Sequence, residues 1–293
     1  MSSLTWNTGP PNFSEFKGLP KPEEKKDGDE VKAQNRWTEP PAKLYNMRGK
    51  DYLTQDGKFK TNNLDFKEPS QESAYECVGL NLYTSNRSRL PACDNIASLR
   101  DLLASQKGVN EIEGDMPQFF VVSWSFNNFF KTQYTFVVHL FKRRIPLDSS
   151  GDSSLERALS KFFGNDDEYK RDRFKFEAKF RDFFNAGLKK SIDMLGGERP
   201  VIIGRKLTTE FHRRDNCFEV CMDVGSSSTA SMLYSLVMKT SGSLSMDYCF
   251  YVEGQEEDEL PERVIGICQW NYCTLEDCAR AIDDEGKVIE DKK

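Results

Sequence analysis

Hydrophobic and polar residues alternate along the middle of the chain, and this alternation predicts β-strands. Two such runs, residues 119–126 and 134–140, are separated by a short link that includes Asn127 and Asn128. We interpret the two runs as an antiparallel hairpin. Because part of the hairpin is apolar on both faces, we place it in the centre of a sheet.

Four segments have helical spacing instead, and the one after Ser153 begins with a capping box formed with Glu156. The other helices are predicted at residues 96–103, at 229–238 and after Thr274. Further strands are predicted at 174–180, 208–211, 218–224, 244–252 and 264–270, with a weak helix after Phe180. We therefore predict an α+β fold, a single domain with a mostly antiparallel β-sheet and flanking helices.

The two ends of the chain differ in composition from the middle. Residues 1–36 are polar and rich in Pro, Gly, Lys and Glu, so we predict a flexible arm there. The domain is expected over residues 37–282. Residues 283–293 form a charged tail that we expect to fray.

Composition excludes several classes of protein. The chain has 293 residues, 30% of them charged, and a net charge of -6, which argues against nucleic-acid binding. It contains no apolar run of the length of a membrane span, so we expect it not to be transmembrane. The start lacks the pattern of a secretory signal. The eight cysteines include no CxxC pair and there are only two histidines, so we expect reduced thiols, no metal, no cofactor and a cytoplasmic location.

The segment Gly225-Ser226-Ser227-Ser228 joins a predicted strand to a predicted helix. Main-chain amides at such a helix start, together with the helix dipole, suit a phosphate or carboxylate. Under the alternative interpretation the serines only cap the helix. The spacing is not that of a P-loop, because no Gly-Lys-Ser/Thr follows.

A basic cluster flanks the strand just before this segment. Lys206, Arg213 and Arg214 could present their cationic groups to the same anion, and we predict that they join the serine-rich turn in one site. The alternative is an exposed hairpin with solvated charges. A second basic run, residues 142–144, either binds an anion or simply ends a strand.

Catalytic chemistry finds little support in the sequence. The nucleophile pattern Gly-x-Ser-x-Gly is absent at the serine-rich turn. His139 lies in a hydrophobic run and His212 lies beside Arg213 and Arg214, so we predict no enzyme and no catalytic residue. The acidic run at residues 256–262 is interpreted as a solvated loop.

Several motifs in order resemble the C-terminal domain family of the plant protein Enhanced Disease Resistance 2. They span most of the chain, and Tyr169 and Lys170 stand where the family has Phe and Arg. The motifs are Trp37, RGKDYL (48–53), NDDEYKRDRFK (165–175), PVIIGRK (200–206), DVGSS (223–227) and LPERVIG (260–266). In the plant proteins, pleckstrin-homology and START modules precede this domain and account for most of the membrane association, whereas we expect a stand-alone domain here.

The resemblance implies no enzymatic activity, and it links the family to lipids and membranes. Our leading hypothesis is a non-enzymatic, intracellular domain that binds lipid or a membrane surface through a phosphorylated headgroup, peripheral at membranes. The alternative is a protein-interaction scaffold or regulatory domain without a lipid ligand, in which the acidic loop or the N-terminal arm holds a protein partner.

Overall fold

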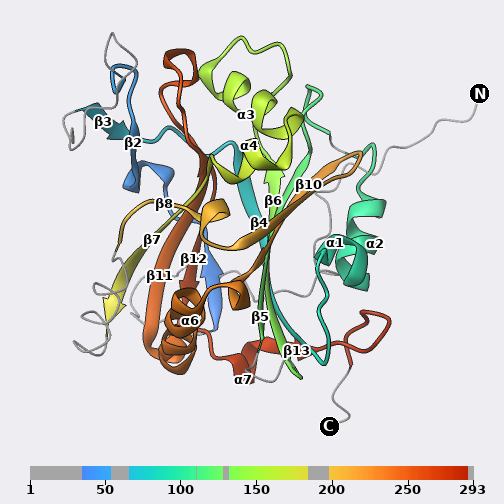
Figure 1. The fold of residues 1–293 in the computed structure, drawn as a ribbon. Coiled ribbons are helices and arrows are strands. Elements are labelled where there is room, and N and C mark those ends of the chain that lie inside the picture. Colours follow the sequence, from blue (N-terminus) through green and yellow to red (C-terminus); the bar gives the residue numbers. More distant parts are fainter. Residues whose placement is uncertain (1–34, 54–65, 110, 128–131, 184–197, 290–293) are drawn as a thin grey trace, which may run out of the picture.

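Two β-sheets packed face to face form the body of the structure, a computed structural model that describes residues 35–53, 66–109, 111–127, 132–183 and 198–289 (Figure 1). The six-stranded sheet has the order β13 (Ala279–Ala281), β4 (Tyr75–Ser85), β6 (Tyr134–Arg143), β5 (Phe119–Asn127), β10 (Cys217–Asp223) and β9 (Thr208–Arg213). The five-stranded sheet has the order β1 (Arg36–Thr38), β12 (Val264–Asn271), β11 (Leu244–Val252), β7 (Phe174–Phe183) and β8 (Val201–Ile202).

Helices and a small β-ribbon surround the two sheets. The ribbon pairs β2 (Asn46–Arg48) with β3 (Lys67–Pro69). The helices are α1 (Ala92–Asn95), α2 (Ala97–Ser105), α3 (Ser154–Gly164), α4 (Asp167–Arg171), α6 (Ser228–Thr240) and α7 (Leu275–Cys278). All strand pairs are antiparallel except β5 with β10 and β4 with β13. The fold is α+β, as predicted.

The predicted hairpin is formed by β5 and β6, and it lies in the middle of the six-stranded sheet. Its apolar pattern on both faces has a direct cause. Phe120 and Val122 point into the core between the sheets, whereas Phe119 and Val121 pack on the opposite face against α1 and α2. The link at residues 128–131 lies outside the described residues.

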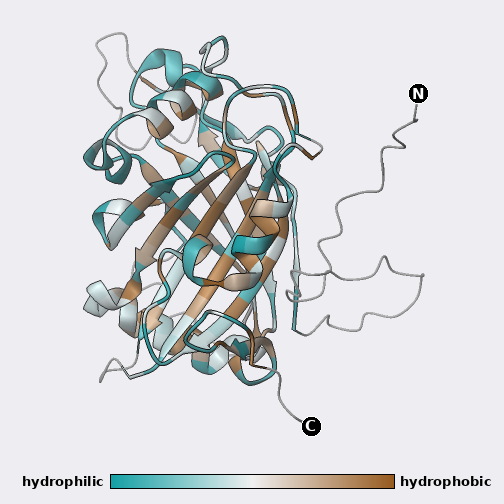
Figure 2. Cartoon of the chain, turned by 90° about the vertical axis from the view of Figure 1, so that its right-hand side faces the viewer, coloured by the Kyte–Doolittle hydropathy of each residue, from teal (hydrophilic) through white to brown (hydrophobic). Residues whose placement is uncertain are grey.

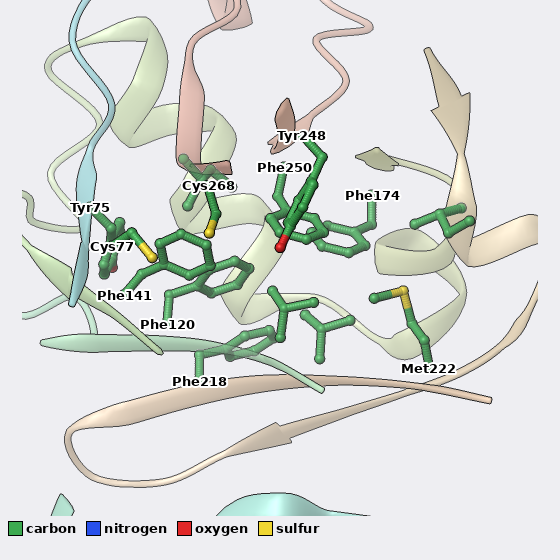
Figure 3. Packing of buried hydrophobic residues seen from close by; sticks show 14 of the residues in the cluster. Tyr75, Cys77, Phe120, Phe141, Phe174, Phe218, Met222, Tyr248, Phe250 and Cys268 are labelled. Carbon is green, nitrogen blue, oxygen red and sulfur yellow. The ribbon is translucent and has the colours of Figure 1, made fainter. Parts of the chain in front are cut away.

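Aromatic rings fill the core between the sheets (Figure 3). The ring of Phe120, on β5, lies 6.2 Å from those of Phe141 and Phe174, and the ring of Phe174 stacks on Phe250 at 5.9 Å. Gly266 permits this packing, because a Cβ there would approach the Phe141 ring to 2.7 Å. Figure 2 shows the hydrophobic residues concentrated along the strands.

The strand predictions were incomplete. β7 continues to Phe183, where we expected a weak helix after Phe180, because the main-chain pairing with β11 continues to Leu244. β4 was not predicted at all. Its alternation is interrupted where its register with β6 shifts between Cys77 and Gly79.

The C-terminal tail is ordered as far as Ile289, although we expected it to fray. Ile282 forms a β-bridge with Val288, and the amide of Ile289 donates to the carbonyl of Ala281 at 2.8 Å. The buried guanidinium of Arg89 also donates to the carbonyl of Asp284 at 3.0 Å. At the other end of the chain, β1 contains Trp37. Residues 1–34 of the predicted arm lie outside the described residues.

Candidate functional site

The Gly225–Ser228 turn links β10 to α6, and most of its polar groups already have partners. The amide of Gly225 donates to Asp223 Oδ1 at 2.9 Å, and the hydroxyl of Ser226 donates to the Asp223 carbonyl. Ser227 is the N-cap of α6 and accepts from the amide of Ala230 at 3.3 Å. Helix capping, the structural alternative considered above, is therefore what Ser227 does.

Two groups of the predicted anion site do come together at this turn. The amide of Thr208 donates to Ser226 Oγ at 2.8 Å, which holds the start of β9 against the turn. Lys206 lies two residues before Thr208 and is exposed. No hydrogen bond to the amides of Ser228 or Thr229 is formed by any residue that the structure describes. Lys206, Ser228 and Thr229 are thus all exposed, each two or three residues along the chain from the contact between Thr208 and Ser226.

The two arginines are placed elsewhere, which corrects the prediction of a single convergent site. In the β9–β10 hairpin Thr208 is opposite Asp223, whereas Arg213 is opposite Phe218. Arg213 lies five positions further along the strand than Thr208, a distance of roughly 17 Å. Arg213 lies over the Phe163 ring, its guanidinium 5.8 Å from the centroid.

Arg214 is used in an ion cluster at that far end of the hairpin. Its guanidinium makes two hydrogen bonds to Asp94 on α1, at 2.6 and 2.9 Å, and lies 3.3 Å from the carboxylate of Glu219. Glu219 is fully buried and also accepts from the amides of Ala92 and Cys93. Arg214 therefore holds α1 on the sheet and is not available to a ligand at Gly225.

A cavity of about 210 Å³ lies between the sheets on the inner side of the same turn. Leu207 and Val224 contribute to its wall, and Lys206 and Gly225, which are their neighbours in the chain, are exposed. Side chains from both sheets, from the segment before β9 and from α6 complete the wall: Trp124, Phe126, Val137, His139, Phe176, Ala178, Phe180, Ile203, Ala230, Leu233, Tyr234, Val237, Met238, Met246, Tyr248 and Trp270.

The roof of the cavity is α6, and its packing is unusual for a helix of 13 residues. None of its residues is buried, although Leu233, Val237 and Met238 face the cavity. From α6, the ring of Tyr234 stacks on Phe126 of β5, with the ring centroids 3.6 Å apart. Tyr234 is half-buried, and its partial removal from water raises its pKa to about 12. The sequence predicted this helix but gave no sign of the space beneath it.

Two polar side chains in the wall satisfy each other. His139 Nδ1 lies 3.2 Å from the carbonyl of Val122 and Nε2 lies 2.7 Å from the hydroxyl of Tyr248. Because a carbonyl can only accept, Nδ1 carries the proton and Nε2 accepts from Tyr248. Burial lowers the pKa of His139 to about 4, so the ring is neutral at pH 7. The wall therefore presents almost only hydrocarbon to a ligand.

Other candidate sites are structural or absent in the described part of the chain. No cluster of His, Cys, Asp and Glu there could hold a metal, and all eight cysteines are buried. Arg143, from the second basic run, is buried and donates to the carbonyls of Met116, Leu147 and Gly114. None of the described helices combines the length and hydrophobicity that a bilayer span requires.

Comparison with known proteins identifies the family. The family model described as Protein ENHANCED DISEASE RESISTANCE 2, C-terminal matches residues 37–273. The chain belongs to this family. The Enhanced Disease Resistance 2-like protein of Arabidopsis thaliana is 30% identical over 79 residues, a match that covers 27% of this chain and 11% of that protein. No solved structure matches significantly.

In this Enhanced Disease Resistance 2 C-terminal domain, three motif segments meet in one ion cluster. Arg48 and Lys175 both contact the carboxylate of Glu253, at 3.1 and 2.5 Å. Both also approach Glu262, at 3.7 and 3.4 Å. Although burial opposes it, these two cations hold the pKa of Glu253 below its ordinary value.

The acidic loop is thus only partly the solvated run that we predicted. Glu259 and Glu262 are buried, and Glu259 pairs with Lys161 of α3 at 2.9 Å. Glu256 and Asp258 remain more than half exposed. The three motif segments of this ion cluster therefore tie the outer ribbon to the sheet. Two other motif segments contribute Ile203 and Val224 to the wall of the cavity.

Proposed function

We propose that this domain is a non-enzymatic binding domain for an amphipathic anionic lipid. The apolar part of the lipid would enter the cavity beneath α6, and its phosphorylated headgroup would lie at the rim beside Lys206. The observation that carries this proposal is the apolar cavity of about 210 Å³ roofed by a helix without a buried residue.

The size of the cavity indicates what it would hold. An engineered protein cavity of about 150 Å³ with apolar walls stays dry and binds benzene. The cavity here is larger, yet smaller than the roughly 300 Å³ at which pockets enclose a drug-sized ligand. It therefore suits a hydrocarbon segment of a larger molecule, with the remainder at the surface.

The rim supplies the polar half of the proposed site. Lys206 is exposed and, in the described part of the chain, pairs with no carboxylate. The first turn of α6 adds the positive end of the helix dipole and the amides of Ser228 and Thr229. Arg213 and Arg214 are left out of this proposal because they lie at the other end of the hairpin.

The proposal remains non-enzymatic because neither histidine serves a serine of the turn. The ring nitrogens of His139 contact Val122 and Tyr248. The ring of His212 lies 3.4 Å from Glu210. Labelling of Ser226, Ser227 or Ser228 by a fluorophosphonate probe would contradict this part.

Displacement of a fluorescent fatty acid from the full chain tests the proposal. The competitors are lysophosphatidic acid, which carries a phosphate, and the matching monoacylglycerol, which is neutral. We expect both to bind and Ala178→Trp, which fills the cavity, to abolish binding of both. Ala104→Trp on the exposed surface of α2 is the matched control.

A separate variant tests the proposed contact between the phosphorylated headgroup and Lys206. Lys206→Glu should weaken lysophosphatidic acid about tenfold and leave the neutral lipid unchanged, since only the charged headgroup needs the ammonium. Lys43→Glu, at another exposed lysine, is the control. If the unaltered chain binds neither competitor, the lipid proposal fails and the scaffold hypothesis takes its place.

A further inference from the structure

The segment that roofs the cavity is almost free of charge. From Val224 to Met246, between Asp223 and Asp247, the only charged residue is Lys239, in a chain of which 30% is charged. Surface helices usually carry charged residues on the face away from the core. Something other than water is therefore expected to meet the outer face of α6.

That outer face has a defined composition. Its exposed residues, at spacings that place them along one side of the helix, are Ser228, Thr229, Met232, Ser235 and Lys239. Met232 is 64% exposed, the highest value among the large hydrophobic residues in the described part of the chain. The inner face, with Leu233, Val237 and Met238, lines the cavity. Both faces of α6 are thus compatible with hydrocarbon.

Movement of α6 away from the sheets would widen access to the cavity, and the surroundings of the helix decide what that movement costs. If α6 moves away from the cavity in water, large apolar side chains of its inner face become exposed. Each of them lowers the fraction of molecules in this open state about tenfold or more. Against lipid chains the same side chains keep an apolar environment. A bilayer is therefore a partner that could open this roof without that penalty.

Charge at the rim favours the same partner. Lys206 and Lys239 are exposed, and neither pairs with a carboxylate within the described residues. Each lysine close to an anionic membrane strengthens binding roughly fivefold. The chain as a whole carries a charge of -6, so these two lysines, one of them in a helix that contains no acidic residue, would orient the domain on an anionic surface.

We propose that α6 is a lid that docks on a phospholipid bilayer through the face carrying Met232 and opens the cavity to a lipid there. This inference rests on the proposed function, because it assigns a route and a partner to the same cavity.

The test uses the full chain and vesicles of phosphatidylcholine with a minor fraction of phosphatidylserine. The vesicles carry a fluorescent lysophospholipid, and the measured quantity is the rate of its transfer to the protein. We expect Met232→Glu to slow transfer about tenfold, because a carboxylate replaces an apolar contact on a negative surface. Binding of the same probe presented in solution without vesicles should not change, because Met232 does not line the cavity.

The control is Val109→Glu, which also places a carboxylate at an exposed apolar residue, but one that follows α2 and is not part of α6. It should transfer lipid like the unaltered chain. Circular dichroism of each variant confirms that it is folded, and Ser235→Glu replaces Met232→Glu if that variant is not. Equal transfer by the unaltered chain and the α6 variant would overturn the lid, even with solution binding intact. Absence of solution binding in the unaltered chain would instead overturn the proposed function.

Discussion

Helices α3 and α6 cover opposite ends of the same core, and they do so in different ways (Figure 1). α3 buries five of its residues, among them Phe162, which contacts the rings of Phe174 and Phe218. α6 is longer and buries none. Both begin with a serine N-cap, Ser153 and Ser227. The local signals that start a helix are thus the same in α3 and α6. The two helices differ in what lies beneath them, because α3 is part of the close-packed core whereas α6 covers a cavity.

The comparison predicts the largest difference for the removal of one inward-facing side chain from each helix. Phe162→Ala should lower the free energy of unfolding by about 3–5 kcal/mol, because it leaves a cavity in close-packed surroundings. Leu233→Ala should cost about 1 kcal/mol, since its side chain is only half-buried beside an existing cavity. Urea denaturation measures both. Equal losses would show that α6 packs as firmly as α3.

The pH dependence of the free energy of unfolding tests whether His139, in the wall of the cavity, is shielded from water. His139 has a pKa of about 4 in the folded chain and about 6.5 when unfolded, so the unfolded state binds more protons between these values. Stability should therefore fall as the pH drops from 6.5 towards 4, by about 3 kcal/mol from this residue. His139→Gln should flatten that part of the profile.

Nuclear magnetic resonance provides the direct measurement for the same residue. The His139 ring should stay neutral down to a pH near 4 in the folded chain. A titration near pH 6.5 would mean that water reaches the ring, and the interpretation of a dry apolar cavity would be wrong.

Hydrogen exchange sharpens the comparison at the level of the main chain. If α6 opens as a lid while the sheets stay folded, its amides should exchange at least roughly tenfold faster than those of α3. A saturating amphipathic ligand should slow exchange in α6 and leave α3 unchanged. Identical rates in both helices, with and without ligand, would contradict a separately opening α6.

The smallest effects are expected at the two caps. Ser153→Ala should lower the free energy of unfolding by about 1 kcal/mol, because it removes a capping box from a helix that is part of the cooperative core. Ser227→Ala removes a similar bond from α6, and its effect should appear mainly as faster local exchange. If both variants lowered the free energy of global unfolding by the same amount, α6 would unfold in the same cooperative unit as α3.

Most of the fold could be predicted because local patterns determine it. Alternation located β5, β6 and β10, and the capping box located α3. β4 escaped because a register shift near Gly79 interrupts its alternation. The strand after Phe180 escaped because its partner, β11, is distant in sequence and decides the outcome.

The candidate site could be predicted only in part, since it depends on three-dimensional register. Lys206 and the Gly225 turn meet because Thr208 is opposite Asp223, and the same pairing carries Arg213 away. The burial of Glu262 could not be predicted either, because a run of acidic residues is expected to be solvated. Only the structure shows that Arg48 and Lys175 lie beside Glu262. A cavity depends on what all neighbouring side chains leave unfilled, which no single segment records.

The edge strand β1 has a consequence for synthesis of the protein. Its residues pair with β12, Trp37 opposite Trp270, so the five-stranded sheet is complete only when the residues of β12, more than 220 positions further along the chain, have left the ribosome. Until then the nascent chain carries the unpaired edge of a hydrophobic sheet, and contacts between such distant segments form slowly. Delayed closure of this kind exposes a newly made polypeptide to aggregation and to chaperones.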